Sequence, residues 1–256
     1  MVGTPDYLLP ELQALNDSAL AAKRPWVLLK PSGTVLLVGP LLRPGATGCW
    51  ECLAHRMRFN RQLESYASRN GGHEMPVAVA KGWTASSYAF AASFSATELV
   101  RSLLAAGDEG LESGLLSFDL AKRRLERHPF TRRPQCPACG DPGLGLPGPP
   151  VVLESRPKQG PVSGTERGKA EAGELERLER HVSPITGVVT SLTLREPEMG
   201  GTTHSCVAGH FFPVRPGDLT ALKVNLVARS GGKGRTAVQA RTGAICEAIE
   251  RTSGIA

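Results

Sequence analysis

The stretches CWEC (Cys49–Cys52) and CPAC (Cys136–Cys139) decide how this chain is organised. In each, two residues separate the cysteines, so both sulfurs turn toward one point, and two such turns supply the four thiolates of a tetrahedral zinc site. In the second stretch Pro137 has a fixed φ, and Gly140, directly after Cys139, permits a tight turn at the end of the motif. We predict that Cys49, Cys52, Cys136 and Cys139 bind one structural zinc ion. The alternative is a pair of redox-active motifs.

The composition is that of an ordinary globular protein. The chain has 256 residues, of which 41% are hydrophobic and 21% charged, enough for one or two domains. Its net charge is +6, and its 30 Lys and Arg residues are interspersed with 24 Asp and Glu residues. This mixed distribution argues against a nucleic-acid partner. The start resembles no signal peptide, and no run is long enough to span a membrane. Paired CxxC motifs without a secretion signal predict a cytoplasmic protein that uses its cysteines for metal, with no membrane partner.

Apolar periodicity and turn residues predict an α/β (α+β) chain. Helical spacing is expected over 8–22, 53–68, 84–104, 167–180 and 236–252. Strands are expected over 26–30, 34–38, 115–119, 124–128, 184–194, 204–212 and 220–228. A run rich in proline and glycine after the second cysteine pair predicts a linker. We therefore divide the chain into a zinc-bearing domain (1–141), a linker with a short charged helix (142–180) and a second α/β domain (181–256).

The stretch SGGKGRT (Ser230–Thr236) precedes the last predicted helix. We expect a glycine-rich loop whose backbone N–H groups approach an anion, with Lys233 adding a positive charge, although the spacing is not that of a Walker loop. Further along, Glu247 and Glu250 share one helix face, as two carboxylates that hold Mg²⁺ beside a polyphosphate would. Arg251 either contacts phosphate or pairs with Glu247. The alternative is a plain strand–turn–helix connection with a solvated helix face.

These motifs resemble two regions of one known family. The stretches Ser230–Gly234 and Ala240–Arg251 are similar to the start of the ATP-binding region of YcaO-type proteins, and Val182–Val189 resembles the opening strand of that domain. The stretches Gly48–Leu53 and His128–Gly140 resemble the zinc-bearing ThiF-like region of azole-forming cyclodehydratases. Fused members of that family carry both regions on one chain, in this order.

The resemblance implies an activity and a set of partners. Such enzymes use ATP and Mg²⁺ to form thiazoline and oxazoline rings from Cys, Ser and Thr of a ribosomal precursor peptide, in bacteriocin-type natural-product biosynthesis. By this resemblance Ser230 and Lys233 meet ATP, Glu247 and Glu250 hold Mg²⁺ with Arg251 nearby, and zinc is structural. A flavin dehydrogenase, other pathway enzymes and further copies of the chain are the implied protein partners. No catalytic residue is assigned.

The chain also departs from the fused cyclodehydratases, because it is far shorter. We expect it to lack a peptide-recognition module and the first half of a ThiF-like region, and the sequence stops at Ala256, soon after the first ATP motif. We therefore expect a fragment, the remnant of a frameshifted gene or a split-gene product, inactive alone. Two other functions stay open. One is a ThiF-type adenylating enzyme, and the other is a non-catalytic zinc scaffold that presents precursor peptide to a separate cyclodehydratase and tolerates loss of Glu247 and Glu250.

Overall fold

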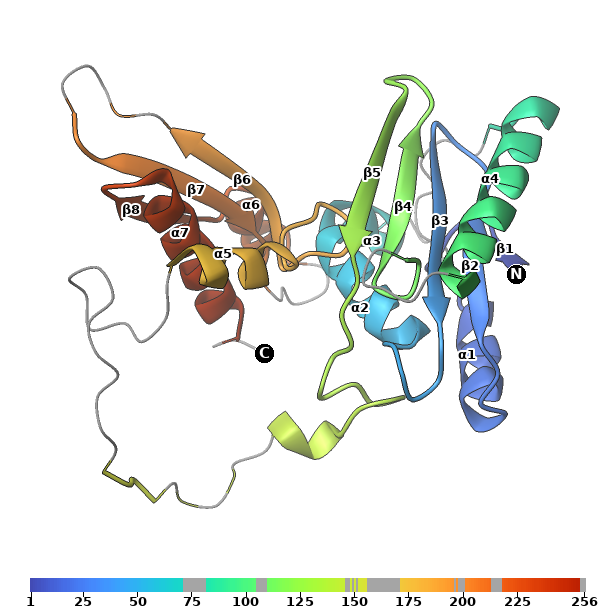
Figure 1. Ribbon diagram of the computed structural model, residues 1–256, viewed down its shortest axis with the longest axis horizontal. Coiled ribbons are helices and arrows are strands. Elements are labelled where there is room, and N and C mark those ends of the chain that lie inside the picture. The colour runs from blue at the N-terminus through green and yellow to red at the C-terminus, as the bar shows by residue number, and fades with distance from the viewer. Residues whose placement is uncertain are drawn as a thin grey trace.

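The computed structural model contains two separate β-sheets, each covered by helices (Figure 1). It describes residues 1–70, 82–104, 110–145, 148, 150, 152–155, 171–195, 197, 201–212 and 218–253. Within these ranges, no helix has the length and apolar character needed to cross a bilayer. Mixed helices and sheets confirm the predicted α+β class.

The first sheet has five strands in sequence order. They are β1 (Val2–Gly3), β2 (Trp26–Lys30), β3 (Val35–Leu42), β4 (Gly114–Asp119) and β5 (Arg124–Pro129). The β1–β2 pair is parallel and the other pairs are antiparallel, so both hairpins predicted from the sequence are confirmed. Because side chains alternate along a strand, β2 and β3 bury residues on both faces of the sheet.

Helices cover both of these faces. Helices α1 (Glu11–Ala21) and α2 (Trp50–Asn60) pack on one face, and α4 (Ala85–Leu104) packs against β2 and β3 on the other (Figure 1). The helix predicted over 53–68 is broken at Arg61, after which α3 (Gln62–Asn70) begins. At the break, the Arg61 guanidinium forms a 3.0 Å ion pair with Asp6. The side chains of Asn60 and Gln62 donate hydrogen bonds to backbone carbonyl oxygens near the second sheet. These tertiary contacts override the continuous helical periodicity.

The second sheet is antiparallel and smaller. Its strands are β6 (Val189–Arg195), β7 (His204–His210) and β8 (Arg229–Gly234), in that order, and helices α5 (Glu171–Glu179) and α7 (Ala237–Ser253) cover one face. Helix α5 buries Leu175 and Leu178 as predicted, although residues 167–170 of the predicted helix lie outside the described residues. In the linker, the short helix η1 (Pro142–Gly145) is described, and most of 146–170 is not.

The strand predicted over 220–228 is wrong, because this segment is the helix α6 (Leu219–Leu226). The carboxylate of Asp218 accepts a 2.8 Å hydrogen bond from the backbone N–H of Ala221 and so caps the helix. Leu222 and Asn225, three residues apart, are the buried positions. The helical cap and period thus outweigh the β-branched residues that suggested a strand.

The glycine-rich loop expected before α7 is also wrong as a structure, since residues 229–234 form β8 and only two residues lead into the helix. A Cβ added at Gly232 would lie 2.0 Å from the carbonyl oxygen of Ala240 and 2.3 Å from the nitrogen of Ala244. Glycine here lets the α7 backbone lie directly against the strand. Close helix–strand packing, with no anion involved, is sufficient reason for this residue.

Candidate functional site

Four thiols meet between α2 and the segment that follows β5. The sulfurs of Cys49 and Cys136 are 3.7 Å apart, those of Cys52 and Cys139 are 3.5 Å apart, and all four lie within 4.8 Å of one another. Four thiolates at the usual Zn–S distance of about 2.3 Å would be separated by about 3.8 Å at the corners of a tetrahedron. The predicted set is therefore assembled in a geometry that fits a metal such as zinc. It is the one such group among the residues that the structure describes.

The backbone fixes both cysteine pairs. Cys49 occupies the N-cap of α2 without making a side-chain cap, and the buried Asn16 of α1 instead accepts a 3.0 Å hydrogen bond from the N–H of Trp50. In the second pair, Gly140 donates to the carbonyl of Cys136, and a Cβ at Gly140 would lie 2.2 Å from the oxygen of Pro134. Asn16 is a supporting residue that the sequence did not reveal, because nothing local marks it.

Hydrogen bonds set the charge of the thiols. The Cys49 thiol and the backbone N–H of Arg133, 3.4 Å from the Cys52 sulfur, lower the pKa of Cys52 to about 5. The hydrogen bond with Cys52, together with burial, raises the pKa of Cys49, and burial raises that of Cys139. Without metal, burial and these hydrogen bonds therefore favour the thiolate at Cys52 and the protonated thiol at Cys49 and Cys139. A divalent cation that binds all four must displace the remaining protons.

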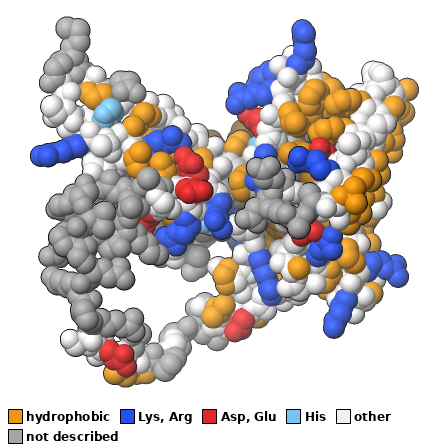
Figure 2. Space-filling model, in the orientation of Figure 1, with side chains coloured by type: hydrophobic (Ala, Val, Ile, Leu, Met, Phe, Trp, Pro, Cys, Tyr) orange, Lys and Arg blue, Asp and Glu red, His pale blue; other side chains and the backbone are white. Residues whose placement is uncertain are grey.

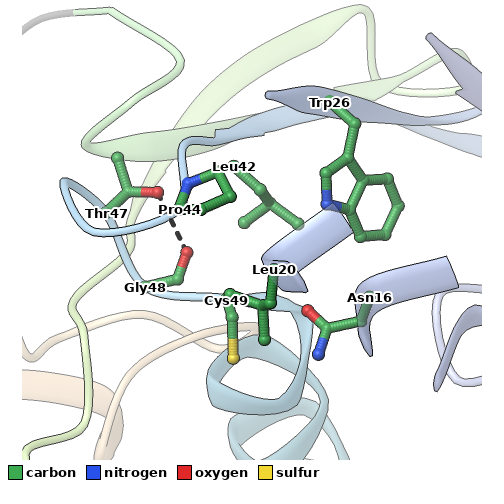
Figure 3. A pocket seen from close by; sticks show the side chains of 8 residues that line it. All are labelled: Asn16, Leu20, Trp26, Leu42, Pro44, Thr47, Gly48 and Cys49. Atoms are coloured by element: carbon green, nitrogen blue, oxygen red, sulfur yellow. Dashed lines mark hydrogen bonds between the residues drawn. The ribbon is translucent and has the colours of Figure 1, made fainter. Parts of the chain in front are cut away.

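A small pocket with a volume of about 10 Å³, roughly room for one water molecule, lies beside Cys49 (Figure 3). It is lined by Asn16, Leu20, Trp26, Leu42, Pro44, Thr47, Gly48 and Cys49. Figure 3 shows the sulfur of Cys49 pointing away from the other lining side chains. The pocket therefore lies on the side of Cys49 away from its sulfur.

The residues predicted to bind nucleotide lie on β8 and α7, and only some of them contact one another. The Glu247 carboxylate accepts a 3.0 Å hydrogen bond from the N–H of Gly231 and forms a 2.5 Å ion pair with Arg251. Ser230 is buried and its hydroxyl hydrogen-bonds to Nε2 of His210 at 2.9 Å. Lys233 is exposed and, by alternation along β8, lies on the face opposite Ser230. Glu250 is exposed on α7, three residues after Glu247.

The start of α7 is capped by the protein itself. The hydroxyl of Thr236 accepts a 3.2 Å hydrogen bond from the N–H of Gln239, and the Gln239 side chain accepts a 2.8 Å hydrogen bond from the N–H of Arg235. This resembles a capping box, which the T-x-x-Q spacing indicates and our sequence prediction missed, except that Gln239 accepts from Arg235 and not from the N-cap residue Thr236. It occupies the N–H of Arg235, which belongs to the stretch expected to approach an anion, and the N–H of Gln239 in the first turn of α7.

Polar contacts connect the two sheet regions. The side chain of Asn60 donates to the carbonyl oxygens of Ile185 and Gly187, at 3.1 and 3.0 Å. The buried His128 hydrogen-bonds through Nε2 to Ser117 at 2.7 Å and through Nδ1 to Ser183 at 3.0 Å. Both regions therefore meet at a hydrogen-bonded junction beside the cysteine cluster.

Burial favours the neutral form of His128. It lowers the pKa of His128 from its usual range, and in a neutral imidazole one ring nitrogen donates and the other accepts. Its partner Ser183 accepts the N–H groups of Ile185 and Thr186, each at 3.1 Å, and the Ser183 hydroxyl also lies 3.1 Å from that of Thr186.

Comparison with solved structures identifies the class of protein. A heterocyclase solved in complex with substrate and cofactor is 36% identical, with a TM-score of 0.83, and the match covers 99% of this chain and 34% of that one. The heterocyclase TruD is 34% identical, with a TM-score of 0.61, over 74% of this chain and 28% of its own. No family model and no curated protein sequence matches the chain.

The chain thus has the fold of the heterocyclases. In particular, it is similar to the azole-forming cyclodehydratases, so the resemblance seen in the sequence is confirmed. It spans about a third of the length of the heterocyclases that it matches.

Proposed function

We propose that this chain is the zinc-bearing and nucleotide-binding part of a cyclodehydratase that forms thiazoline or oxazoline rings in a ribosomal precursor peptide. The observation that supports this most strongly is 36% identity to a heterocyclase over 99% of the chain. That heterocyclase was solved with a substrate and a cofactor bound. Since the match covers 34% of its length, ring formation is proposed for a protein with the missing parts supplied.

In this proposal the four cysteines bind zinc for structural reasons alone. A site with four thiolates has no open position for a substrate, in contrast to a catalytic zinc site with three protein ligands. The metal would tie the N-terminus of α2 to the segment after β5, far apart in sequence. It would thereby hold one side of the junction at Asn60 and His128 against which the second region packs.

The nucleotide site is proposed at the junction of β8 and α7. When bound, Mg–ATP supplies the phosphoryl group that converts the peptide amide oxygen into a leaving group during ring closure. Glu247 is held in place by Gly231 and Arg251, and Glu250 is exposed beside it, so both carboxylates can be offered to Mg²⁺. Ser230, Lys233 and Arg251 remain proposed phosphate contacts.

Titration of the full chain with Mg–ATP tests this site. We expect Glu250→Gln to weaken binding by at least about tenfold, since it removes a proposed Mg²⁺ ligand. Glu176→Gln, an equally exposed change on α5, is the matched control and should bind like the wild type. Equal affinities for both variants would reject the assignment of Glu250. In the completed enzyme, each ring formed should reduce the peptide mass by one water.

A non-catalytic zinc scaffold is the second candidate. It is favoured by the capping of α7, where Thr236 and Gln239 already occupy amides that a phosphate would need. This function predicts that the chain does not bind Mg–ATP at all and that ring formation by a completed enzyme tolerates Glu250→Gln. Ring formation by the completed enzyme carrying Glu250→Gln therefore distinguishes the two functions.

A further inference from the structure

Two arginines lie beside the cysteine cluster. Arg56 is on α2, four residues after Cys52, so its side chain leaves the same side of the helix as that cysteine. Arg133 is in the irregular segment after β5, and its backbone N–H lies 3.4 Å from the Cys52 sulfur. Both arginines are half-buried. Figure 2 shows that Lys and Arg side chains gather more widely in this part of the molecule, between the two sheet regions.

Neither arginine has a carboxylate partner within the part of the chain that the structure describes. The acidic residue of α2, Glu51, pairs with Arg58 at 3.2 Å and so does not neutralise Arg56. The two guanidinium groups also disfavour each other, because burial and then the charge of Arg133 lower the pKa of Arg56. The fold thus holds two like charges together without an acidic side chain between them.

Such a pair of cations requires a negative charge close by. Taking a charged group out of water is costly unless an opposite charge compensates it. Among the described residues, the negative group that acts on Arg56 is the thiolate of Cys52. One thiolate offsets only one of the two cations. Four thiolates, however, exceed the charge of one divalent metal ion, so a zinc-loaded cluster is a dianion and matches both arginines.

We propose that the Arg56 and Arg133 side chains neutralise the zinc–thiolate cluster and thereby increase its affinity for zinc. This inference rests on the structural zinc site of the proposed function. Groups that surround metal ligands without touching the metal typically change metal affinity by about 10–100-fold. The two cations come from α2 and the segment after β5, the same two parts of the chain that supply the cysteines. Zinc binding and the docking of these two parts therefore support each other.

Competition with a chromophoric chelator measures the zinc affinity of the full chain and tests the proposal. Arg56→Met removes the charge but keeps an unbranched side chain, and it should weaken zinc binding at least about tenfold. Arg133→Met should have a similar effect, and it alters no helix or strand. Arg195→Met is the matched control, because Arg195 is an exposed arginine of β6 that forms no ion pair in the described structure. It should bind zinc like the wild type.

A variant that keeps the charge separates electrostatics from packing. Arg56→Lys should bind zinc nearly as tightly as the wild type. Zinc affinities that are equal in the wild type, Arg56→Met and Arg133→Met would overturn the proposal. So would an Arg56→Lys variant as weak as Arg56→Met, since the effect would then depend on shape. A wild-type chain that binds no zinc would instead reject the structural zinc site itself, and this inference with it. Circular dichroism of each variant verifies that the chain remains folded.

Discussion

Replacing Gly232 by alanine should separate α7 from the small sheet. The new Cβ would lie 2.0 Å from the oxygen of Ala240 and 2.3 Å from the nitrogen of Ala244, whereas ordinary contacts begin near 3.4 Å. Both neighbours are backbone atoms and cannot rotate away, so the helix must retreat by more than 1 Å. Overpacking of this kind costs about 1–3 kcal/mol, and we expect the upper end of that range. Gly231→Ala is the control, because a Cβ there meets nothing within 4 Å.

The assay must report on α7 directly. Trp26, Trp50 and Trp83 all lie in the first region, so their fluorescence does not follow the small sheet. Hydrogen exchange of the amides in 237–253 follows α7 directly, and the exchange should be faster in Gly232→Ala. In Gly231→Ala, exchange should stay the same or slow slightly, since a compatible Gly→Ala change stabilises by about 0.4–1 kcal/mol. Equal protection of α7 in the two variants would refute the packing argument for the glycine-rich stretch.

Three further changes test other parts of the structure. Cys139→Ser should abolish metal binding and unfold the first region, because structural zinc sites in small domains contribute about 10–16 kcal/mol; a folded, metal-free variant on circular dichroism would contradict this. The free energy of unfolding should fall as the pH drops below the usual histidine pKa, since burial lowers the pKa of His128 and the unfolded chain takes up the proton first. His128→Gln should make the free energy of unfolding depend less on pH, as measured by denaturant titrations at several pH values. An unchanged pH dependence would argue against this role of His128. Asn60→Ala removes two hydrogen bonds across the junction and should cost about 1–2 kcal/mol, seen as faster exchange over 182–190 with the five-stranded sheet unaffected.

The thiol cluster was predictable because its geometry is local. A spacing of two residues brings Cys49 close to Cys52, and Cys136 close to Cys139, whatever the rest of the chain does, and thiolate chemistry then favours joining the pairs. The hairpins and α4 were predictable for a similar reason, since turn residues and a long apolar period identify them within one window.

The errors have two causes, a local helix signal that was overlooked and tertiary contacts that outweigh local preference. The strand expected over 220–228 is a helix because Asp218 caps it, and its β-branched residues decided the prediction wrongly. The glycine-rich stretch matched a phosphate loop in composition, yet Gly232 is required by the close approach of α7. Asn16 supports the start of α2 from another helix, a contact across 34 residues that no local pattern reveals.

The structural zinc site can be tested on the purified chain by measuring how much metal it contains and which residues bind that metal. Native mass spectrometry should find one zinc ion per chain, and Cys49, Cys52, Cys136 and Cys139 should resist alkylation until a chelator removes it. A folded chain without metal, whose four thiols react freely or are joined as disulfides, would contradict the structural zinc site on which the fold and the proposed function both depend.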